Sequence, residues 1–122
     1  MKTSHPGINI QFPISQLILD GRKTIETRRY PLPAKYIGKE LFIIETPGKD
    51  GKFSARIVGT IRFSNCFLYN NKKQFYKDWA QHFVDKTSPY AWTTKKKWGW
   101  EIEKVTVFKQ PIQAPRKKGI CF

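Results

Sequence analysis

A long alternation of apolar and polar residues requires this chain to fold around a β-strand. Phe53, Ala55, Ile57, Ile61 and Phe63 keep odd-numbered positions, while Arg56, Thr60 and Arg62 take even ones. That period is typical of a strand with one buried face. Gly59 interrupts the pattern where a β-bulge would fit. A single strand cannot bury its apolar face alone, so the chain needs partner strands.

Several other segments predict those partners. A continuous apolar run predicts a strand that is covered on both faces, and the turn at Pro47–Gly51 predicts that it forms a hairpin with the long strand. Near the C-terminus the alternation changes phase, which predicts a bulge near Glu103 and Lys104. Ile112 and residues 120–122 are expected to add short edge pairing. The expected strands are residues 8–12, 24–29, 41–44, 53–63 and 98–107.

Two segments show helical periodicity. Ile14, Leu17 and Ile18 share one face of a short helix that Gly21 would end. Aromatic residues repeat every four positions over residues 72–84, which predicts an amphipathic helix with core-facing aromatics and an asparagine cap. Five or six strands with two or three helices and no βαβ rhythm indicate an α+β fold, a small and mostly β barrel.

The composition restricts the partners. The 122 residues fit a single domain, 1–122, and an aromatic fraction of 15% suits a compact core. The formal net charge of +14 favours an anionic partner, foremost RNA or another nucleic acid, although an idle basic surface remains an alternative. The sequence shows no apolar run of the ~20 residues that a membrane span needs, and no secretory signal. We therefore expect a cytoplasmic protein that does not bind membranes.

The cysteines and histidines give no metal-binding pattern. Cys66 and Cys121 lie far apart, and the only histidines are His5 and His82. This spacing matches no zinc motif, so we expect reduced thiols, no metal site and no cofactor.

The segment Gly21–Arg29 is the leading candidate for a functional site. It reads GRKTIETRR, in which a helix stop is followed by a short strand. Glu26 and Arg28 are two residues apart, so both side chains point to the same strand face, ~7 Å from each other. An exposed ion pair that contributes roughly 0–1 kcal/mol is the simpler alternative.

A basic run forms a second candidate region. Lys95, Lys96 and Lys97 lie between Trp92 and Trp98. Lysines beside tryptophans suit phosphate contact combined with base stacking. A solvated loop would have the same composition.

The order of these features resembles the activating-signal-cointegrator homology (ASCH) domain of the PUA-like superfamily. The specific part is Gly21-Arg22-Lys23-Thr24-Ile25-Glu26-Thr27-Arg28, which follows the family pattern Gly-x-Lys-x-x-Glu-x-Arg. From about Ile8 to Pro111 the likeness is one of order and spacing. The resemblance implies a pseudo-barrel whose cleft binds RNA or another nucleic acid. It places Lys23, Glu26 and Arg28 on the cleft floor, with Trp92, Trp98 and Trp100 as weaker candidates for its wall.

Some members of the wider family are amidohydrolases that act on a modified cytidine through a lysine, a threonine and a distant glutamate. This chain keeps the lysine as Lys23 but carries Glu26 at the threonine position. Thr24 would need a shifted geometry to replace that threonine. The distant glutamate has no clear match, since only Asp78, Asp85 and Glu101 lie in the relevant half. These departures weaken the amidohydrolase prediction.

Three functions follow from the sequence. In the first, a nucleic-acid-binding module, Lys23, Arg28, Arg29 and Lys95–Lys97 contact phosphates, while Trp92 and Trp98 stack on bases. The second is a metal-independent hydrolase acting on RNA or a modified nucleoside, with Lys23, Glu26 and Thr24 as catalytic candidates. The third is an interaction domain for an acidic protein. Alternatively, Glu26 only orients Arg28 within the barrel mouth.

Overall fold

The protein folds around one five-stranded mixed sheet, and the computed structural model describes residues 6–114. Its strands are β1 (Gly7–Gln11), β2 (Ile25–Arg28), β3 (Glu40–Thr46), β4 (Arg56–Leu68) and β5 (Trp98–Gln113). They lie in the order β1-β3-β4-β5-β2, with β1 and β3 parallel and every other neighbouring pair antiparallel. The α-helices are α1 (Ile14–Leu19), α2 (Lys72–Lys77) and α3 (Trp79–His82), and a 3-10 helix, η1, spans Ala34–Tyr36. The predicted α+β class is confirmed.

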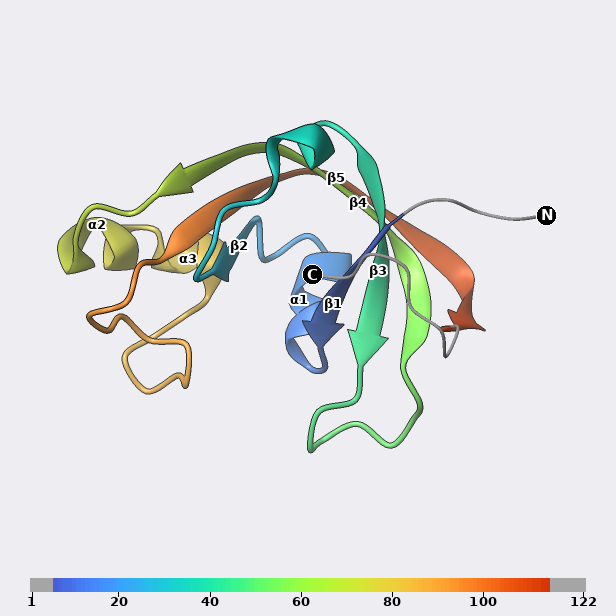
Figure 1. Cartoon of the computed structure of the whole chain (residues 1–122). Helices are drawn as coiled ribbons and strands as arrows, with labels where there is room; N and C mark the ends of the chain where they lie inside the picture. Colours follow the sequence, from blue (N-terminus) through green and yellow to red (C-terminus); the bar gives the residue numbers. More distant parts are fainter. Residues whose placement is uncertain (1–5, 115–122) are drawn as a thin grey trace.

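The sheet curls strongly. β4 and β5 form a long ribbon that arches over α1, with β1 and β3 on one side of the arch and β2 on the other (Figure 1). Although β1 and β2 are opposite edges of the sheet, Arg28 of β2 donates a hydrogen bond of 2.8 Å to the backbone carbonyl of Asn9 in β1. The two edges therefore lie within reach of one side chain, as in a barrel that is not closed by a backbone ladder.

The main core fills the inside of this curl. It combines the inward positions of β1, β3 and β4 with Ile18 of α1, and Phe63 packs edge-on against Trp100 with ring centroids 5.4 Å apart. Two-residue periodicity gives these strands one apolar face. Its buried members are Ile8, Ile10, Ile18, Leu32, Leu41, Ile43, Val58, Ile61, Phe63 and Trp100.

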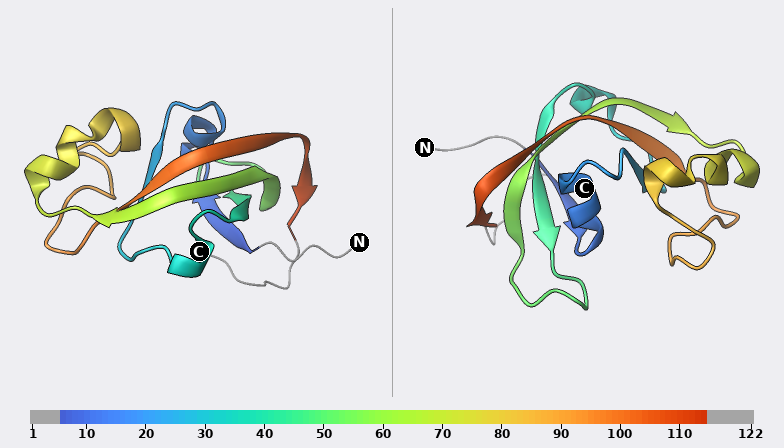
Figure 2. Two further views of the ribbon diagram at one scale, coloured as in Figure 1. Left: turned by 90° about the horizontal axis from the view of Figure 1, so that it is seen from above. Right: turned by 180° about the vertical axis from the view of Figure 1, so that it is seen from behind.

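A second, smaller core supports α2 and α3, which lie together at one end of the β4–β5 ribbon (Figures 1 and 2). Tyr69, Phe75 and Val84 are its buried members, and Trp92 packs against them. Trp79 is 47% exposed. The prediction that the periodic aromatics of this segment all face the core is therefore wrong for Trp79.

The helix predicted over residues 72–84 is also broken in two. Asp78 separates α2 from α3, and its carboxylate accepts a hydrogen bond of 2.7 Å from the Tyr69 hydroxyl. α3 ends at His82, and the next residue, Phe83, has a left-handed φ of 60°. The predicted cap is confirmed, because the Asn71 side chain accepts a hydrogen bond from a backbone amide of the first turn. Periodicity locates the helical region but does not detect the interruption at Asp78.

Both predicted bulges occur. The pairing of β4 changes register at Gly59, where a Cβ atom would collide with the backbone carbonyl oxygen of Thr106. The pairing changes register again at Glu103. Lys104 and Ile102 pair with two consecutive residues of β4, so Glu103 between them is left out of the backbone pairing. These bulges bend the ribbon and help the sheet to curl.

The predicted strands need three corrections. β4 begins at Arg56 rather than Phe53 and continues to Leu68, beyond the point where the alternation fades. In β3 only one face is fully buried, since Phe42 and Ile44 are partly exposed. β5 is a single strand that includes Ile112, whereas residues 120–122 lie outside the described part of the chain.

Two further sequence expectations concern single residues and the membrane. Cys66 is a half-buried free thiol whose sulfur accepts a hydrogen bond from the Leu32 amide, while Cys121 and His5 lie outside the described residues. Among residues 6–114 no helix has the length and apolar character needed to span a bilayer.

Candidate functional site

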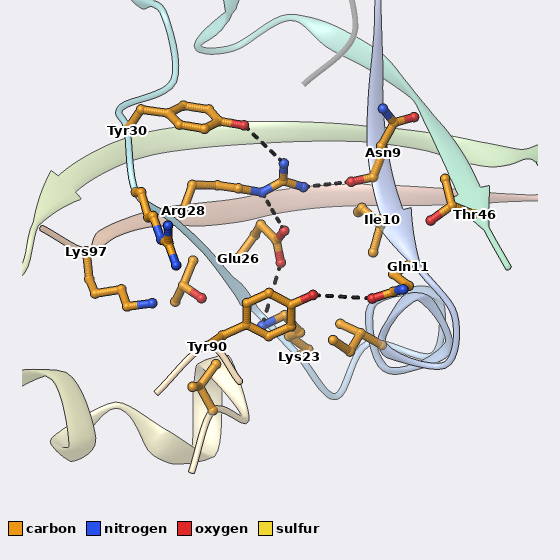
Figure 3. A pocket seen from close by; sticks show the side chains of 14 residues that line it. Asn9, Ile10, Gln11, Lys23, Glu26, Arg28, Tyr30, Thr46, Tyr90 and Lys97 are labelled. Atoms are coloured by element: carbon orange, nitrogen blue, oxygen red, sulfur yellow. Dashed lines mark hydrogen bonds and ion pairs between the residues drawn. The ribbon is translucent and has the colours of Figure 1, made fainter. Parts of the chain in front are cut away.

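A pocket of about 320 Å³ lies where the two edge strands of the sheet approach each other (Figure 3). β1 and β2 contribute much of its wall, and the loop between α3 and β5 contributes Val84, Tyr90 and Lys97. The lining residues are Asn9, Ile10, Gln11, Ile14, Lys23, Glu26, Thr27, Arg28, Arg29, Tyr30, Thr46, Val84, Tyr90 and Lys97. Four of these are cationic and one is a carboxylate, so the pocket is strongly positive.

The end of α1 positions the first of these cations. Gly21 has a left-handed φ of 83°, and the Lys23 amide donates a hydrogen bond of 2.9 Å to the Leu17 carbonyl. This turn directs Lys23 inward, where only 3% of the residue is exposed. Its ammonium donates to the backbone carbonyl of His82 at 2.5 Å. Lys23 thus ties the segment before β2 to the end of α3.

Glu26 joins Lys23 to Arg28. One carboxylate oxygen lies 3.7 Å from the Lys23 ammonium, and the other accepts a hydrogen bond of 2.8 Å from Nε of Arg28. All three side chains are largely buried. Glu26 and Arg28 therefore form a largely buried ion pair, and not the exposed pair that was the simpler alternative.

Arg28 has further partners beyond Glu26. Besides the bond to Asn9, its Nη1 donates to the Tyr30 hydroxyl at 3.3 Å, and the guanidinium lies 5.5 Å from the centre of the Trp100 ring. These contacts fix the guanidinium at the opening between β1 and β2 (Figure 3).

The buried charges perturb each other. Burial lowers the pKa of Lys23, and Arg28 adds to that effect, although Glu26 opposes it. For Arg28, burial on its own would lower the pKa, but attraction to Glu26 and the hydrogen bonds to Tyr30 and Glu26 raise it. Arg28 is consequently the more firmly charged of the two cations.

Lys97 and Arg29 form a different kind of pair. Lys97 is only 4% exposed, and its amino group points into the pocket (Figure 3). Neither side chain makes an ion pair or hydrogen bond with any residue between 6 and 114. Burial lowers the pKa of Lys97, and repulsion from Arg29 lowers it further. Two cations without a counter-ion can receive an anion.

The wall opposite the sheet includes Tyr90. Its hydroxyl donates a hydrogen bond of 3.2 Å to the Gln11 side-chain carbonyl, which joins the α3–β5 loop to the end of β1. Tyr90 is 43% exposed and Tyr30 is 44% exposed, so both rings are accessible from solvent. Accessible aromatic faces beside cations allow stacking on a planar ligand.

The structure brings five of the sequence-predicted site residues together. Lys23, Glu26, Arg28, Arg29 and Lys97 all line the pocket. Those that lie outside its lining are Thr24, Trp92, Lys95, Lys96 and Trp98.

Thr24 is held by its backbone in an exposed position. Its amide donates to the Gln81 carbonyl and its carbonyl accepts from the Ile102 amide, each at 2.9 Å. Because the backbone turns between Lys23 and β2, Lys23 points inward while Thr24 does not. The structure therefore does not bring Thr24 together with Lys23 and Glu26.

The tryptophans serve the two cores. Trp92 packs against Phe75 with ring centroids 5.6 Å apart, and Trp98 packs against the main core. Trp100 is fully buried, and its indole nitrogen donates to the Tyr30 carbonyl at 3.2 Å. They do not provide the expected cleft wall, where Tyr30 and Tyr90 lie instead.

Sequence reasoning missed the contributions of Asn9, Gln11, Tyr30 and Tyr90. Tyr30 follows Arg28 by two residues, so the strand period could have identified it. Asn9 and Gln11 reach the site through the parallel pairing of β1 with β3, and Tyr90 reaches it through the long loop between α3 and β5. Neither feature leaves a local signal in the sequence. Within residues 6–114 no three His, Cys, Asp or Glu side chains gather in a way that could hold a metal ion.

Comparison with known proteins supports the fold. Neither a protein-family model nor a curated protein sequence matches the chain. Solved structures do match: the ASCH protein from Zymomonas mobilis aligns with 87% of this chain and 71% of its own, at 19% identity and a TM-score of 0.67. Two single-residue variants of the same protein give TM-scores of 0.67 and 0.68 at the same identity. The predicted resemblance is confirmed for the architecture, and this chain has the fold of an ASCH domain.

Proposed function

We propose that this protein binds RNA or another single-stranded nucleic acid through the pocket between β1 and β2. The observation that carries the proposal is the concentration of four cations, Lys23, Arg28, Arg29 and Lys97, around the single lining carboxylate of Glu26. The net charge of +14 extends this attraction beyond the pocket. The ASCH fold is consistent with the same function.

The lining groups suit the parts of a nucleotide. Arg29 and Lys97 are available for phosphate oxygens, since neither has a partner among residues 6–114. The ring faces of Tyr30 and Tyr90 are available for stacking on a base. Glu26 already holds Lys23 and Arg28, so its remaining acceptor capacity would serve a base amino group.

Salt titration tests this proposal. We expect fluorescence anisotropy to show a labelled single-stranded RNA binding at low salt. If three phosphates are neutralised, the logarithm of the affinity should fall with log salt at a slope of about −2. Affinity that does not change with salt, or the absence of binding at low salt, would contradict the proposal. Competition by RNA against an acidic protein separates it from the interaction-domain alternative.

A second candidate function is hydrolysis of RNA, and the buried Lys23–Glu26–Arg28 cluster favours it. Glu26 could accept the proton of a 2′-hydroxyl as that oxygen bonds to the adjacent phosphorus, while Lys23 and Arg28 stabilise the negative charge on the phosphate. The P–O5′ bond breaks, and the leaving 5′-oxygen would take up a proton from Glu26 or from water. Burial lowers the pKa of Lys23, and perturbed pKa values are frequent at functional sites. Thr24 has no part in this scheme, because it lies outside the pocket lining.

Single-turnover assays on a panel of RNAs and modified nucleosides, read by mass spectrometry, test the second function. If it is correct, Glu26→Gln should abolish conversion while retaining most of the RNA affinity. Conversion that persists in this variant would show that Glu26 is not the base. The exposed Glu103 provides a matched control, since Glu103→Gln removes a carboxylate outside the pocket lining.

A further inference from the structure

We infer that the pocket receives the phosphorylated end of a nucleic-acid strand, with the terminal phosphate monoester held between Lys97 and Arg29. This inference rests on the proposed nucleic-acid binding and adds what the pocket selects. Of the three lysines in the basic run, only Lys97 has this role. Lys95 and Lys96 are exposed and lie outside the pocket lining.

The burial of Lys97 is the first observation behind this inference. A lysine side chain is almost never fully buried without a partner, because removing its charge from water is costly. Only 4% of Lys97 is exposed, so its apolar stem is buried, whereas its ammonium is open to the pocket and has no acceptor among residues 6–114. The amino group is aimed into the pocket. An anionic ligand would supply the missing partner.

The strand register explains why a second cation is present. β2 and β5 pair antiparallel, and the last paired residues are Arg28 and Trp98. Arg29 follows Arg28 and Lys97 precedes Trp98, so the two cations lie just beyond the end of this ladder. The charge of Arg29 repels that of Lys97. A bound anion would convert this repulsion into two attractions.

The charge of the pair favours a monoester over the diester of an internal nucleotide. A phosphate monoester carries about −1.5 to −2 charges at pH 7, since its second pKa is ~6. Lys97 and Arg29 together offer two positive charges. Glu26, the one acidic residue among the described lining residues, is already paired with Lys23 and Arg28. A dianion therefore matches the two unpaired cations better than a monoanion does.

The walls of the pocket favour an end of the strand. The hydrogen bond between Tyr90 and Gln11 joins two walls, and Arg28 bridges β2 to β1. An internal nucleotide must let the chain both enter and leave, and these two bridges restrict that passage. A volume of about 320 Å³ is near the lower end for small-molecule sites, ~300–1,000 Å³, which suits one nucleotide.

The test compares three single-stranded RNAs of one sequence by anisotropy at fixed salt. One carries a 5′-phosphate, one a 3′-phosphate and one hydroxyls at both ends. We expect the wild-type protein to bind one phosphorylated form at least ~10-fold more tightly than the hydroxyl form, as charge-assisted hydrogen bonds imply. Lys97→Met retains an apolar stem of similar length, and in this variant the preference should disappear. Lys96→Ala is the matched control and should retain the preference.

The outcomes distinguish this inference from the proposed function. Equal binding of all three RNAs by the wild-type protein would overturn the end-binding inference and leave nucleic-acid binding intact. No binding of any RNA would overturn both. A free nucleoside monophosphate that competes with the phosphorylated RNA at equal affinity would show that the strand is not recognised, which also overturns the inference. Thermal unfolding of each variant confirms that the protein is folded.

Discussion

Arg28 on β2 and Asn9 on β1 connect the two edges of the curled sheet through a side-chain hydrogen bond of 2.8 Å. A backbone ladder between these strands would close the barrel and fill the opening. An arginine bridge leaves room beside it, and that room is the pocket. The same side chain therefore holds the edges together and shapes the site.

Replacing Arg28 should destabilise the fold. In Arg28→Met the bond to Asn9 is lost and Glu26 keeps only the longer contact with Lys23, so we expect a loss of about 2–4 kcal/mol in the free energy of unfolding. Urea denaturation measures this change. Arg22→Met is a matched control, because Arg22 forms an exposed pair with Asp20 and its loss should cost less than about 1 kcal/mol. Equal losses in both variants would show that Arg28 is not a structural bridge.

Glu45 provides a test of acid stability away from the pocket. It is fully buried and accepts hydrogen bonds from Ser15, Gln16 and Arg56 at 2.5, 2.8 and 2.9 Å. Burial on its own would raise the pKa of Glu45, but these hydrogen bonds and the charge of Arg56 lower it below its ordinary value of 4.5. The unfolded chain therefore takes up the proton first, so this contribution is present above pH ~4.5 and is lost as the pH falls.

We expect Glu45→Gln to lower the free energy of unfolding by about 1–3 kcal/mol at pH 7 and to reduce its dependence on pH below 4.5. Urea denaturation between pH 3.5 and 7 measures both effects. Glu103→Gln, at an exposed site, should change stability by less than about 0.5 kcal/mol. An unchanged acid slope in Glu45→Gln would contradict the assignment.

His82 should make stability depend on pH near neutrality. Its Nδ1 accepts from the Val84 amide at 2.9 Å, and its Nε2 lies 2.6 Å from the Phe75 carbonyl, so the buried ring is a neutral Nε2–H tautomer. Burial lowers the pKa of His82 below 6.5, and Lys23 adds to that effect. The unfolded chain binds the proton first, so stability is full above pH ~6.5 and falls as the pH decreases towards the folded-state pKa.

From pH 7.5 to 5.5 we expect the wild-type protein to lose up to about 1.4 kcal/mol through His82. Urea denaturation at both pH values should show that His82→Gln, although less stable at pH 7.5, loses less over this interval. The comparison between the two proteins removes the effect of His5, which both contain. An equal loss in both would mean that His82 is not the titrating group.

Tyr90 should contribute to ligand binding through its ring. Base stacking on an aromatic side chain is worth roughly 1–3 kcal/mol, so Tyr90→Ala should weaken RNA binding by about 5-fold to 150-fold. Tyr90→Phe keeps the ring but removes the bond to Gln11, and should retain most of the affinity. Anisotropy measures both variants. Equal weakening in the two would assign the effect to the hydrogen bond rather than to stacking.

Much of the fold could be predicted because its signals are local. The alternation along β4, the helix stop at Gly21 and the bulges at Gly59 and Glu103 all follow from short sequence patterns. The break at Asp78 could not be predicted in this way. It coincides with a hydrogen bond from Tyr69, which follows the end of β4 and lies outside the helical segment.

The site was predictable only in part for the same reason. The spacing of Glu26 and Arg28 predicts that they share a face, and the structure pairs them. The burial of Lys97 depends on the α3–β5 loop. In the sequence Lys97 belongs to a run of three lysines, which instead predicts an exposed surface. The role of Asn9 depends on the curl of the whole sheet, which brings a backbone carbonyl of one edge strand to the other.

The most direct test compares two double variants that lose the same charge. Arg29→Ala with Lys97→Met removes two cations from the pocket, whereas Lys95→Ala with Lys96→Ala removes two outside it. If the pocket is the binding site, the first should weaken binding of single-stranded RNA by at least ~30-fold and the second only a few-fold, at equal salt. Equal weakening in both would show that RNA follows net charge alone and would contradict the pocket as its site.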